Sequence, residues 1–490
     1  MADVPSFDRF FIGGEWVAPA TDQRFTVVNP ATEEVIGYAP EATPADVDVA
    51  VAAARVAFDE GPWPRMSPIE RADAMQRLYE LFLLKSGDLA DLITAEMGSP
   101  ILFSHLGQVG AAGMVLEYFV NLTRTYPFEE VRAGFMGPSV VRREPVGVCA
   151  GIIPWNVPLF ITMLKLAPSL ASGSTMVLKP APEPPLDAFV LAQLVEEAGI
   201  PAGVFNVIPA DRAAGESLVR HAGIDKVSFT GSTVAGRAIG AICGEQLKRC
   251  TLELGGKSAA VILPDADLDT VIPELLSMGV MMNNGQACVA QTRILASRDS
   301  YDAVVEALTE GTRALKVGDP TDMETAIGPL VAERQRDRVE GYIEIGRAEG
   351  ARVTTGGGRP AGFDTGWYVE PTVFADVDNS MRIAQEEIFG PVVSVIAYDD
   401  EADAVRIAND SAYGLSGSVW TADVDRGLDV ARRVRTGTYT VNGFGMEWSA
   451  PFGGFKNSGV GRELGPEGLS AYLEDKTINL PAGTEPKLEV

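Results

Sequence analysis

The sequence has 490 residues, of which 46% are hydrophobic, and a formal net charge of -27 at pH 7. This length exceeds what one hydrophobic core supports, so we expect two or three globular domains. The negative charge opposes binding to nucleic acid or an anionic membrane. Four cysteines without a CxxC pair exclude a disulfide scaffold, and with two histidines no metal site is expected.

The first residues carry neither a basic segment nor an apolar segment of a secretory signal, so we expect a cytoplasmic protein. Residues 147–164 form an uncharged run whose length suggests a membrane helix. Pro154, Asn156 and Pro158 would break such a helix. We therefore expect a buried strand, a loop and a buried helix there.

In chain order, short β-rich pieces at 10–12 and 25–28 come first, followed by helices. Thr43 is expected to cap one helix, and Ser67 with Glu70 to form the capping box of another. A third, apolar helix is expected over residues 101–122. Residues 123–144 read as an exposed hairpin that either pairs with another subunit or is an ordinary surface loop.

From Gly147 to Glu253, short Val- and Ile-rich strands alternate with helices. The expected strands are 148–153, 174–178, 204–208, 226–230 and 250–254, and the expected helices are 159–170, 186–198, 212–221 and 232–243. This alternation predicts a doubly wound parallel sheet, a class that binds nucleotides at the strand carboxyl ends. Strands expected at 259–263, 293–296, 392–397 and 416–420 predict a second α/β domain.

Three residues in distant stretches carry candidate chemistry. Cys288 follows a long apolar segment that could deliver a reactive thiol, although an isolated cysteine is more often an inert, buried hydrophobe. Glu253 ends an apolar strand, where burial would raise its pKa toward that of a general base; alternatively it faces solvent or pairs with Lys257. The amide of Asn156 could stabilise an oxyanion or only satisfy the loop backbone.

A glycine-containing turn at residues 229–236 joins an expected strand to an expected helix. Backbone N–H groups at the start of that helix, near Ser232, could face a phosphate. Gly231 and Gly236 would allow the phosphate to approach the backbone closely. Such a turn serves structural packing equally often, so the turn alone does not show that a phosphate binds here.

Seven motifs occur in an order that resembles the aldehyde dehydrogenase superfamily. They are P-W-N-x-P (154–158), L-K-P (178–180), F-T-G-S-T-x-x-G (229–236), L-E-L-G-G-K (252–257), G-Q-x-C (285–288), E-E-I-F-G-P (386–391) and P-F-G-G-x-K-x-S-G (451–459). The resemblance implies NAD(P)-dependent, non-acylating oxidation of a small-molecule aldehyde to a carboxylic acid.

The resemblance also implies the roles of five catalytic residues. Cys288 would form a thiohemiacetal and then a thioester, and Asn156 would hold the oxyanion. Glu253 would activate the water that hydrolyses the thioester. Lys165 and Glu463 match a proton relay behind this base.

The cofactor that the resemblance implies is NAD, with NADP possible. Pro182 stands where many strictly NAD-dependent members carry a glutamate that repels a 2′-phosphate, and Glu183 is displaced by one position. The implied cofactor residues are Ile153, Pro154, Trp155, Lys179, Gly231, Ser232, Gly236, Leu254, Glu387 and Phe389.

The aldehyde tunnel that the resemblance implies is almost entirely apolar, which favours a bulky aliphatic, terpenoid or aromatic aldehyde. Ordinary core packing would also give an apolar set. Glu447 at the tunnel mouth could instead attract a cationic amino-aldehyde. The implied tunnel residues are Val157, Leu164, Ala287, Val289, Met446, Trp448 and Phe452.

The implied fold has a Rossmann-like, doubly wound NAD(P)-binding domain (1–122 and 146–255) and an α/β catalytic domain (256–454). A small β segment (123–145 and 470–490) would join subunits into a homodimer or homotetramer, and residues 455–469 would return to the cofactor domain. Two alternatives stay open. Glu253 argues against a CoA-acylating semialdehyde dehydrogenase, and Cys288, Glu253 and Asn156 together argue against a catalytically silent, crystallin-like relative.

Overall fold

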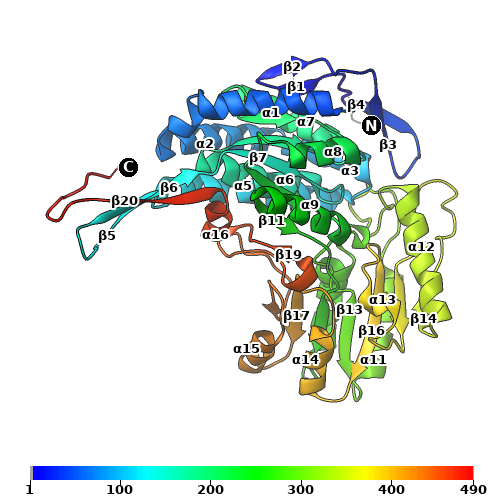
Figure 1. The fold of residues 1–490 in the computed structure, drawn as a ribbon. Helices are drawn as coiled ribbons and strands as arrows, with labels where there is room; N and C mark the ends of the chain where they lie inside the picture. Colours follow the sequence, from blue (N-terminus) through cyan, green and yellow to red (C-terminus); the bar gives the residue numbers. More distant parts are fainter. Residues whose placement is uncertain (1–3, 489–490) are drawn as a thin grey trace.

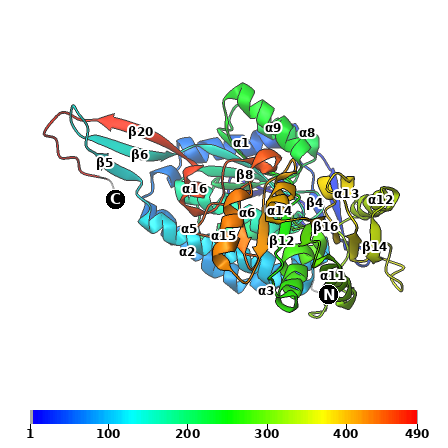
Figure 2. The same cartoon turned by 90° about the horizontal axis from the view of Figure 1, so that it is seen from below.

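The computed structural model describes residues 4–488. Residues 1–3 and 489–490, at the ends of the predicted segments 1–122 and 470–490, lie outside the described residues. Two β-sheets with helices on their faces form two bodies, and a third, smaller sheet projects from the first body as an arm (Figures 1 and 2). The fold class predicted from the sequence is confirmed.

The first sheet has the strand order β19-β11-β10-β7-β8-β9-β1-β2. Its strands are β1 (Phe10–Ile12), β2 (Glu15–Val17), β7 (Val148–Ile152), β8 (Thr175–Lys179), β9 (Phe205–Val207), β10 (Lys226–Thr230), β11 (Arg249–Glu253) and β19 (Gly459–Val460). The central strands from β11 to β9 are parallel, as the alternation predicts. Antiparallel β19 and the β1–β2 hairpin extend the two edges. The sequence pattern indicated an N-terminal hairpin region with a strand at 10–12, but not its place at the edge of this sheet.

Helices cover both faces of this sheet. They are α1 (Pro44–Asp59), α2 (Pro68–Leu84), α3 (Ser86–Met97), α4 (Ile101–Phe103), η2 (Ser104–Gly110), α5 (Ala111–Thr125), α6 (Pro158–Ser172), α7 (Leu186–Glu197), α8 (Arg212–Arg220), α9 (Thr233–Gln246) and α16 (Gly465–Ser470). The Ser67 backbone N–H donates to Glu70 Oε2 over 2.8 Å, which confirms the predicted capping box. The apolar helix expected over 101–122 is interrupted by a π-helical segment, η2.

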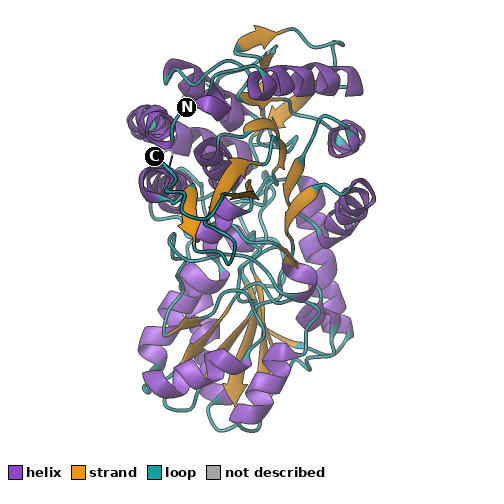
Figure 3. Cartoon of the chain, turned by 60° about the vertical axis from the view of Figure 1, so that its left-hand side comes forward, coloured by secondary structure: helices purple, strands orange, loops and turns teal. Residues whose placement is uncertain are grey.

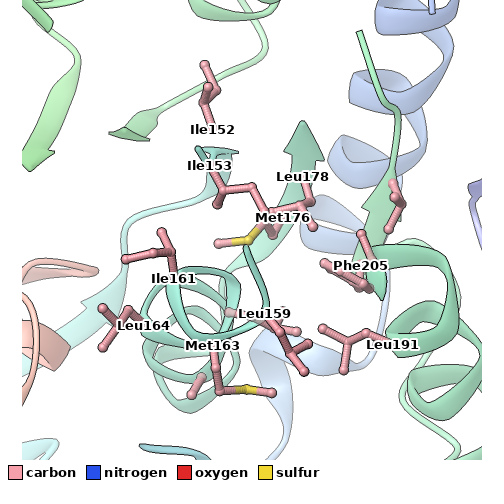
Figure 4. Packing of buried hydrophobic residues seen from close by; sticks show 14 of the residues in the cluster. Ile152, Ile153, Leu159, Ile161, Met163, Leu164, Met176, Leu178, Leu191 and Phe205 are labelled. Carbon is pink, nitrogen blue, oxygen red and sulfur yellow. The ribbon is translucent and has the colours of Figure 1, made fainter. Parts of the chain in front are cut away.

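Helix α6 is the central helix of the first body. All of its residues are buried, because it packs between the sheet and the surrounding helices. Figure 4 shows Leu159 and Met163 of α6 together with Met176 of β8 in one hydrophobic cluster. The uncharged run is thus a buried strand, a loop and a buried helix, as predicted. Among the described residues no helix combines the length and the hydropathy that a membrane crossing needs.

The second sheet has the strand order β14-β15-β16-β13-β12-β17-β18, parallel except for β14. Its strands are β12 (Ala259–Ile262), β13 (Arg293–Ser297), β14 (Arg352–Thr355), β15 (Thr372–Ala375), β16 (Val392–Tyr398), β17 (Gly417–Trp420) and β18 (Thr440–Val441). Its helices are α10 (Leu268–Glu274), η3 (Leu275–Val280), α11 (Tyr301–Ala314), α12 (Glu333–Ala348), α13 (Arg382–Gln385), α14 (Glu401–Asn409) and α15 (Val424–Arg433). Figure 3 shows the strands of this body enclosed by helices.

Successive residues of β12 point to opposite faces of the second sheet. Val261 belongs to the hydrophobic cluster with α12 and α14, whereas Ile262 belongs to the cluster with α10 and α11. Both faces are therefore buried, which explains why these strands read as continuous apolar runs.

The projecting arm is a three-stranded antiparallel sheet. It consists of β5 (Glu129–Arg132), β6 (Ser139–Pro145) and β20 (Leu473–Asn479), with β6 in the centre. The hairpin predicted over 123–144 is confirmed, although α5 continues to Thr125 before it begins. A separate two-stranded sheet pairs β3 (Arg24–Val28) with β4 (Val35–Pro40).

The predicted site residues gather at the carboxyl edge of the first sheet. Lys179 and Glu253 end β8 and β11, while Asn156 and Ser232 follow β7 and β10. In doubly wound sheets this edge is the usual place for a ligand. Ala287 and its neighbours pack against the core of the first body although the chain then enters β13 of the second. The Cys288 loop thus lies where the two bodies meet.

Candidate active site

A sharp reversal of the backbone presents Cys288. The three residues Asn283, Asn284 and Gly285 have φ angles of 52°, 61° and 71°. Asparagine and glycine adopt this left-handed conformation at lower cost than other residues. The Asn-Asn-Gly sequence therefore sets the turn between η3 and β13 on which the thiol sits.

The side chain of Asn284 holds this turn in place. Its Nδ2 donates to the carbonyl oxygens of Gly98 (2.9 Å) and Pro329 (2.8 Å). Its Oδ1 accepts a hydrogen bond from the Gly328 backbone N–H over 2.7 Å. Every polar atom of this buried amide is directed to backbone, so the position of the loop is fixed from both bodies.

Two glycines allow the chain to pass close to the Cys288 loop. A Cβ atom at Gly256 would lie 2.3 Å from the Cys288 carbonyl oxygen, and one at Gly285 would lie 2.3 Å from the Gly390 carbonyl carbon. These separations are far below van der Waals contact. The glycines in three of the seven motifs thus bring Cys288 against the Glu253 and Glu387 segments.

The thiol of Cys288 is only partly exposed. Burial raises its pKa to about 12, and the negative charges of Glu387 and Glu253 contribute to the increase. The resting thiol is therefore protonated near neutral pH. Since only the thiolate is a good nucleophile, an attack by Cys288 needs a base that accepts its proton.

Asn156 lies beside the Cys288 loop. It is 3% exposed, and its Nδ2 donates to the carbonyl oxygen of Gln286 over 2.8 Å. The backbone carbonyl oxygen of Asn156 accepts hydrogen bonds from Gln108 Nε2 (3.0 Å) and Asn283 Nδ2 (2.8 Å). These bonds fix the amide next to the thiol and leave its second N–H to donate to an oxyanion.

Glu253 is 3% exposed, and neither carboxylate oxygen has a hydrogen-bond partner among the described residues. Burial raises its pKa well above the usual value, and the charge of Glu463 adds to the increase. The alternatives of a solvent-facing carboxylate or an ion pair with Lys257 are therefore wrong. A Cβ atom at Gly453 would lie 2.7 Å from Oε1, so glycine is needed beside this carboxylate.

Behind Glu253 lies a buried ion pair. Lys165 Nζ and Glu463 Oε1 are 2.7 Å apart, with side-chain exposures of 0% and 2%. The ammonium also donates to Thr230 Oγ1 (2.8 Å) and to Ser228 Oγ (3.3 Å). The backbone N–H of Glu463 donates to the Phe452 carbonyl oxygen, and the Phe452 N–H donates to the Glu463 carbonyl oxygen. The Lys165 ammonium thus joins Glu463 to two hydroxyl groups of the sheet, and the charges of the pair act on Glu253 without a hydrogen bond to it.

We predict that Lys165→Met lowers the free energy of unfolding by about 3–5 kcal/mol, because it leaves the Glu463 carboxylate buried without its partner. Denaturant unfolding measures the change. The control is the double variant Lys165→Met/Glu463→Gln, in which no buried charge remains and most of the stability should return. Equal losses in the two variants would contradict a role for the charge.

The residues expected to hold a nucleotide surround the start of α9. Ser232 is exposed and caps this helix, with its Oγ accepting from the Ala235 N–H over 3.3 Å. A Cβ at Gly236 would lie 2.3 Å from Leu254 Cδ2, so the glycine brings α9 tightly onto β11. This helix start, with Gly231 before it, has the geometry that binds a diphosphate.

An aromatic pair and a carboxylate face the Cys288 loop from the other side. The rings of Trp155 and Phe389 meet edge to face with centroids 5.4 Å apart. Glu387 Oε1 accepts the Gly256 N–H over 2.9 Å, while burial raises the pKa of this carboxyl. The pair provides a flat apolar wall, and the partly buried Glu387 can accept ribose hydroxyl donors.

Lys179 ends β8, and Glu183 follows it. Burial lowers the pKa of Lys179 to about 8, against the opposing charges of Glu183 and Asp211. Glu183 is also ion-paired with Arg334. Two carboxylates therefore act on Lys179, although Pro182 occupies the position where the family often has a glutamate. Ile153 and Pro154 directly follow β7.

The residues expected to line an aldehyde tunnel lie around the Asn156 and Cys288 loops. Leu164 and Phe452 are buried, and Ala287 and Val289 flank the thiol. Val157, Met446 and Trp448 are partly buried against the same hydrophobic cluster. Glu447 is exposed, and its carboxylate accepts hydrogen bonds from the Ser449 N–H and hydroxyl.

Several residues of the site were not identified from the sequence. Gln108 and the asparagines at 283 and 284 position the loops, and only the Asn-Asn-Gly turn sequence offered a signal. Phe160 packs its ring against Trp448 with centroids 6.0 Å apart and adds an aromatic wall beside the tunnel residues. No cluster of three or more His, Cys, Asp or Glu side chains suited to a metal ion occurs within residues 4–488.

Comparisons with known proteins agree with this geometry. The sequence model described as "Aldehyde dehydrogenase family" matches residues 16–478. A geranial dehydrogenase of Castellaniella defragrans is 47% identical over 473 residues, which cover 96% of this chain and 98% of that protein.

Two solved structures share the fold over nearly the whole chain. A Mycobacterium tuberculosis aldehyde dehydrogenase in complex with NAD+ is 48% identical, with a TM-score of 0.96 and coverage of 99% of this chain and 100% of that one. A mutant aldehyde dehydrogenase C of Pseudomonas syringae, in complex with NAD+ and octanal, is 42% identical, with a TM-score of 0.93 and 96% coverage of both chains.

Proposed function

The chain belongs to the aldehyde dehydrogenase family, and we propose that it oxidises an uncharged, apolar aldehyde to its carboxylic acid with NAD+ and Cys288 as nucleophile. The single observation that carries this proposal is the arrangement of three groups around one loop. The Cys288 thiol, the unpartnered Glu253 carboxylate and the Asn156 amide converge from three distant parts of the sequence.

In the proposed mechanism the Cys288 thiol gives its proton to water and its sulfur attacks the aldehyde carbon. Negative charge then develops on the former carbonyl oxygen, where the second N–H of Asn156 and the Cys288 backbone N–H donate hydrogen bonds. Bound NAD+ supplies the acceptor for the hydride that leaves this carbon. The result is a thioester on Cys288.

Glu253 completes the cycle by activating water against the thioester. Its raised pKa is suited to this task, because a base with a pKa nearer neutrality accepts a proton more readily than an ordinary carboxylate. The proton received by Glu253 would leave through Glu463 and Lys165, which lie behind it. The departing Cys288 sulfur takes up a proton from water, which regenerates the thiol and releases the carboxylic acid.

We propose NAD+ rather than NADP+ as the cofactor. NAD+ is present in the structures of both similar dehydrogenases. In this chain Glu183 and Asp211 direct negative charge at Lys179, which matches the position where the family binds the adenosine ribose. A 2′-phosphate there would meet two carboxylates, and like charges at short range repel.

The substrate proposal rests on the apolar walls near Cys288. Val157, Leu164 and Phe452, together with the Phe160–Trp448 aromatic pair, offer contacts to a hydrocarbon chain or ring. The Glu447 carboxylate is turned onto Ser449, which reduces its use as a partner for a cationic aldehyde. The similar proteins that act on geranial or bind octanal are consistent with an apolar substrate.

The substrate class predicts a ranking of aldehydes. We expect kcat/KM for octanal and geranial to exceed that for betaine aldehyde by about 100-fold, because a quaternary ammonium loses its hydration in an apolar tunnel. Val157→Phe should reduce kcat/KM for octanal by about 10-fold or more and leave acetaldehyde unaffected. NADH absorbance measures both, with the exposed Leu84→Phe as the matched control.

A preference for betaine aldehyde would contradict the proposed apolar tunnel. It would favour the alternative in which the Glu447 carboxylate attracts a cationic aldehyde. Addition of CoA to the same assay tests the acylating alternative, since acyl-CoA instead of free acid would exclude the proposed hydrolysis by Glu253.

We propose further that β20 and the β5–β6 hairpin join subunits into a homodimer or homotetramer. The arm carries large apolar side chains on its tip, where Phe135 and Met136 are fully or almost fully exposed. Exposed groups of this kind are typical of protein interfaces. Mass photometry should show a dimer or tetramer, and deletion of residues 134–137 should weaken the association of the subunits; a monomeric wild type would contradict the proposal.

A cytoplasmic location stays a prediction.

A further inference from the structure

Two cysteines outside the candidate active site meet where helix α9 crosses strand β11. The closest approach of the two elements is at the glycines of α9. A Cβ at Gly236 would lie 2.3 Å from Leu254 Cδ2, and a Cβ at Gly240 would lie 3.3 Å from Leu252 Cδ1. From the first contact to the second, the helix advances by four residues while the strand goes back by two, and each step spans about 6 Å. The two elements therefore run in opposite directions and stay in register.

The next step of this register brings Cys243 over Cys250. Cys243 follows Gly240 by about one helical turn, and Cys250 precedes Leu252 by one strand repeat of two residues. Each of the two side chains is the largest influence on the pKa of the other, as expected for neighbouring sulfur atoms. Both cysteines are free thiols in the structure.

The two thiols differ in their access to solvent. Cys243 is 1% exposed on the inner face of α9, whereas Cys250 is partly exposed near the amino end of β11. Cys250 is three residues from Glu253, or about 10 Å along an extended strand. A small oxidant can therefore reach Cys250 at a place separate from the Cys288 loop.

The surroundings of the pair make Cys250 the more reactive thiol. The hydrogen bond donated by Cys243 lowers the pKa of Cys250 to about 6, with help from the nearby charge of Lys226 and against the effect of burial. The same hydrogen bond raises the pKa of Cys243. Lys226 is buried on β10, with its Nζ donating to Thr251 Oγ1 over 2.8 Å. A thiolate next to a protonated thiol is typical of redox-sensitive cysteines.

We propose that Cys243 and Cys250 form a redox pair that a hydroperoxide closes to a disulfide, at a site separate from Cys288. The Cys250 thiolate attacks one peroxide oxygen, so that an S–O bond forms and the O–O bond breaks. The departing hydroxide takes up the proton that Cys250 had released and becomes water. Cys250 is left as a sulfenic acid.

In the second step Cys243 sulfur attacks Cys250 sulfur. The S–S bond forms, the S–O bond breaks, and the hydroxyl leaves with the Cys243 proton as a second water. Two thiols and one hydroperoxide thus give one disulfide and two waters when the peroxide is hydrogen peroxide, and the two electrons from sulfur reduce it. The two cysteines lie at one crossing of α9 and β11, so the bond joins side chains that are already neighbours in the fold.

The test is peptide mapping of the reduced, full-length protein after one equivalent of hydrogen peroxide. N-ethylmaleimide blocks the remaining thiols before digestion with trypsin, which cleaves between the two cysteines at Lys248 and Arg249. The expected result is a pair of peptides linked through Cys243 and Cys250 that dithiothreitol separates. Maleimide on both cysteines, or a link from either of them to another cysteine, would overturn the proposal.

Two variants sharpen the test. In Cys243→Ser the sulfenic acid on Cys250 has no resolving thiol, so dimedone should label Cys250; labelling of neither residue would overturn the assignment of Cys250 as the attacking sulfur. Cys149→Ser removes the buried thiol of β7 and should keep the link at the wild-type level. Loss of the link in this folded variant would contradict a pair made only of Cys243 and Cys250.

Discussion

Cys288→Ala is expected to reduce steady-state NADH formation by at least about 1000-fold with every aldehyde, because no other group can form the covalent intermediate. The substitution removes one partly exposed sulfur and leaves the Asn284 anchors of the loop intact. Thermal unfolding should therefore be nearly unchanged. The measurement is NADH absorbance with saturating octanal and NAD+.

The matched control is Cys149→Ala, which removes a thiol that is buried in β7 and remote from the loop. It should retain turnover within about twofold, since a cysteine in a core acts mainly as a small hydrophobe. Turnover of Cys288→Ala within tenfold of wild type would contradict nucleophilic catalysis by this residue.

Glu253→Gln should separate the two halves of the reaction. We expect one rapid equivalent of NADH for each active site, followed by steady-state turnover about 100- to 10,000-fold slower than wild type, because the amide cannot activate water. Stopped-flow absorbance resolves the two phases. Glu467→Gln, an exposed carboxylate on α16, is the control and should keep both phases.

If the NADH burst and the steady-state rate fell by the same factor, Glu253 would act mainly in thiol activation. The pH profile provides a second check. Since the pKa of Glu253 is raised in the folded protein, its ionised, basic form accumulates only as pH rises, and wild-type turnover should rise with it. The slow steady state of Glu253→Gln should lack this rise.

The raised pKa of Glu253 also makes the stability of the protein depend on pH. A carboxyl group whose folded pKa is raised stabilises the protein below its unfolded pKa, and this contribution is lost as pH rises through the folded value. The neutral amide of Glu253→Gln avoids that loss. The stability of the variant relative to wild type should therefore increase toward alkaline pH.

Sequence patterns predicted those parts of the fold that local rules control. Alternating apolar strands and helices gave the parallel centre of the first sheet, and the Ser67–Glu70 pattern gave a helix start with the observed capping bonds. The second sheet was anticipated through its strands β12, β13, β16 and β17. The strands β14, β15, β18 and β19 were missed, and β18 and β19 have only two residues each, too few to show a complete period.

The candidate site was predictable as a set of residues but not as a geometry. The order of seven motifs pointed to Cys288, Glu253 and Asn156 at once. Contacts that depend on side chains far apart in sequence, such as Gln108 on the Asn156 carbonyl or Phe160 on Trp448, have no local signature. The contact of Cys243 with Cys250 likewise depends on how α9 crosses β11, which spacing alone does not give.

The most direct test of the account is to trap the covalent intermediate. Glu253→Gln is mixed with octanal and NAD+, quenched in acid after the burst, and mapped by peptide mass spectrometry. We expect one octanoyl group on the peptide that contains Cys288, with about one NADH for each acylated chain. A burst of NADH without an acyl group on Cys288, or with the acyl group on another residue, would show that Cys288 does not carry the thioester.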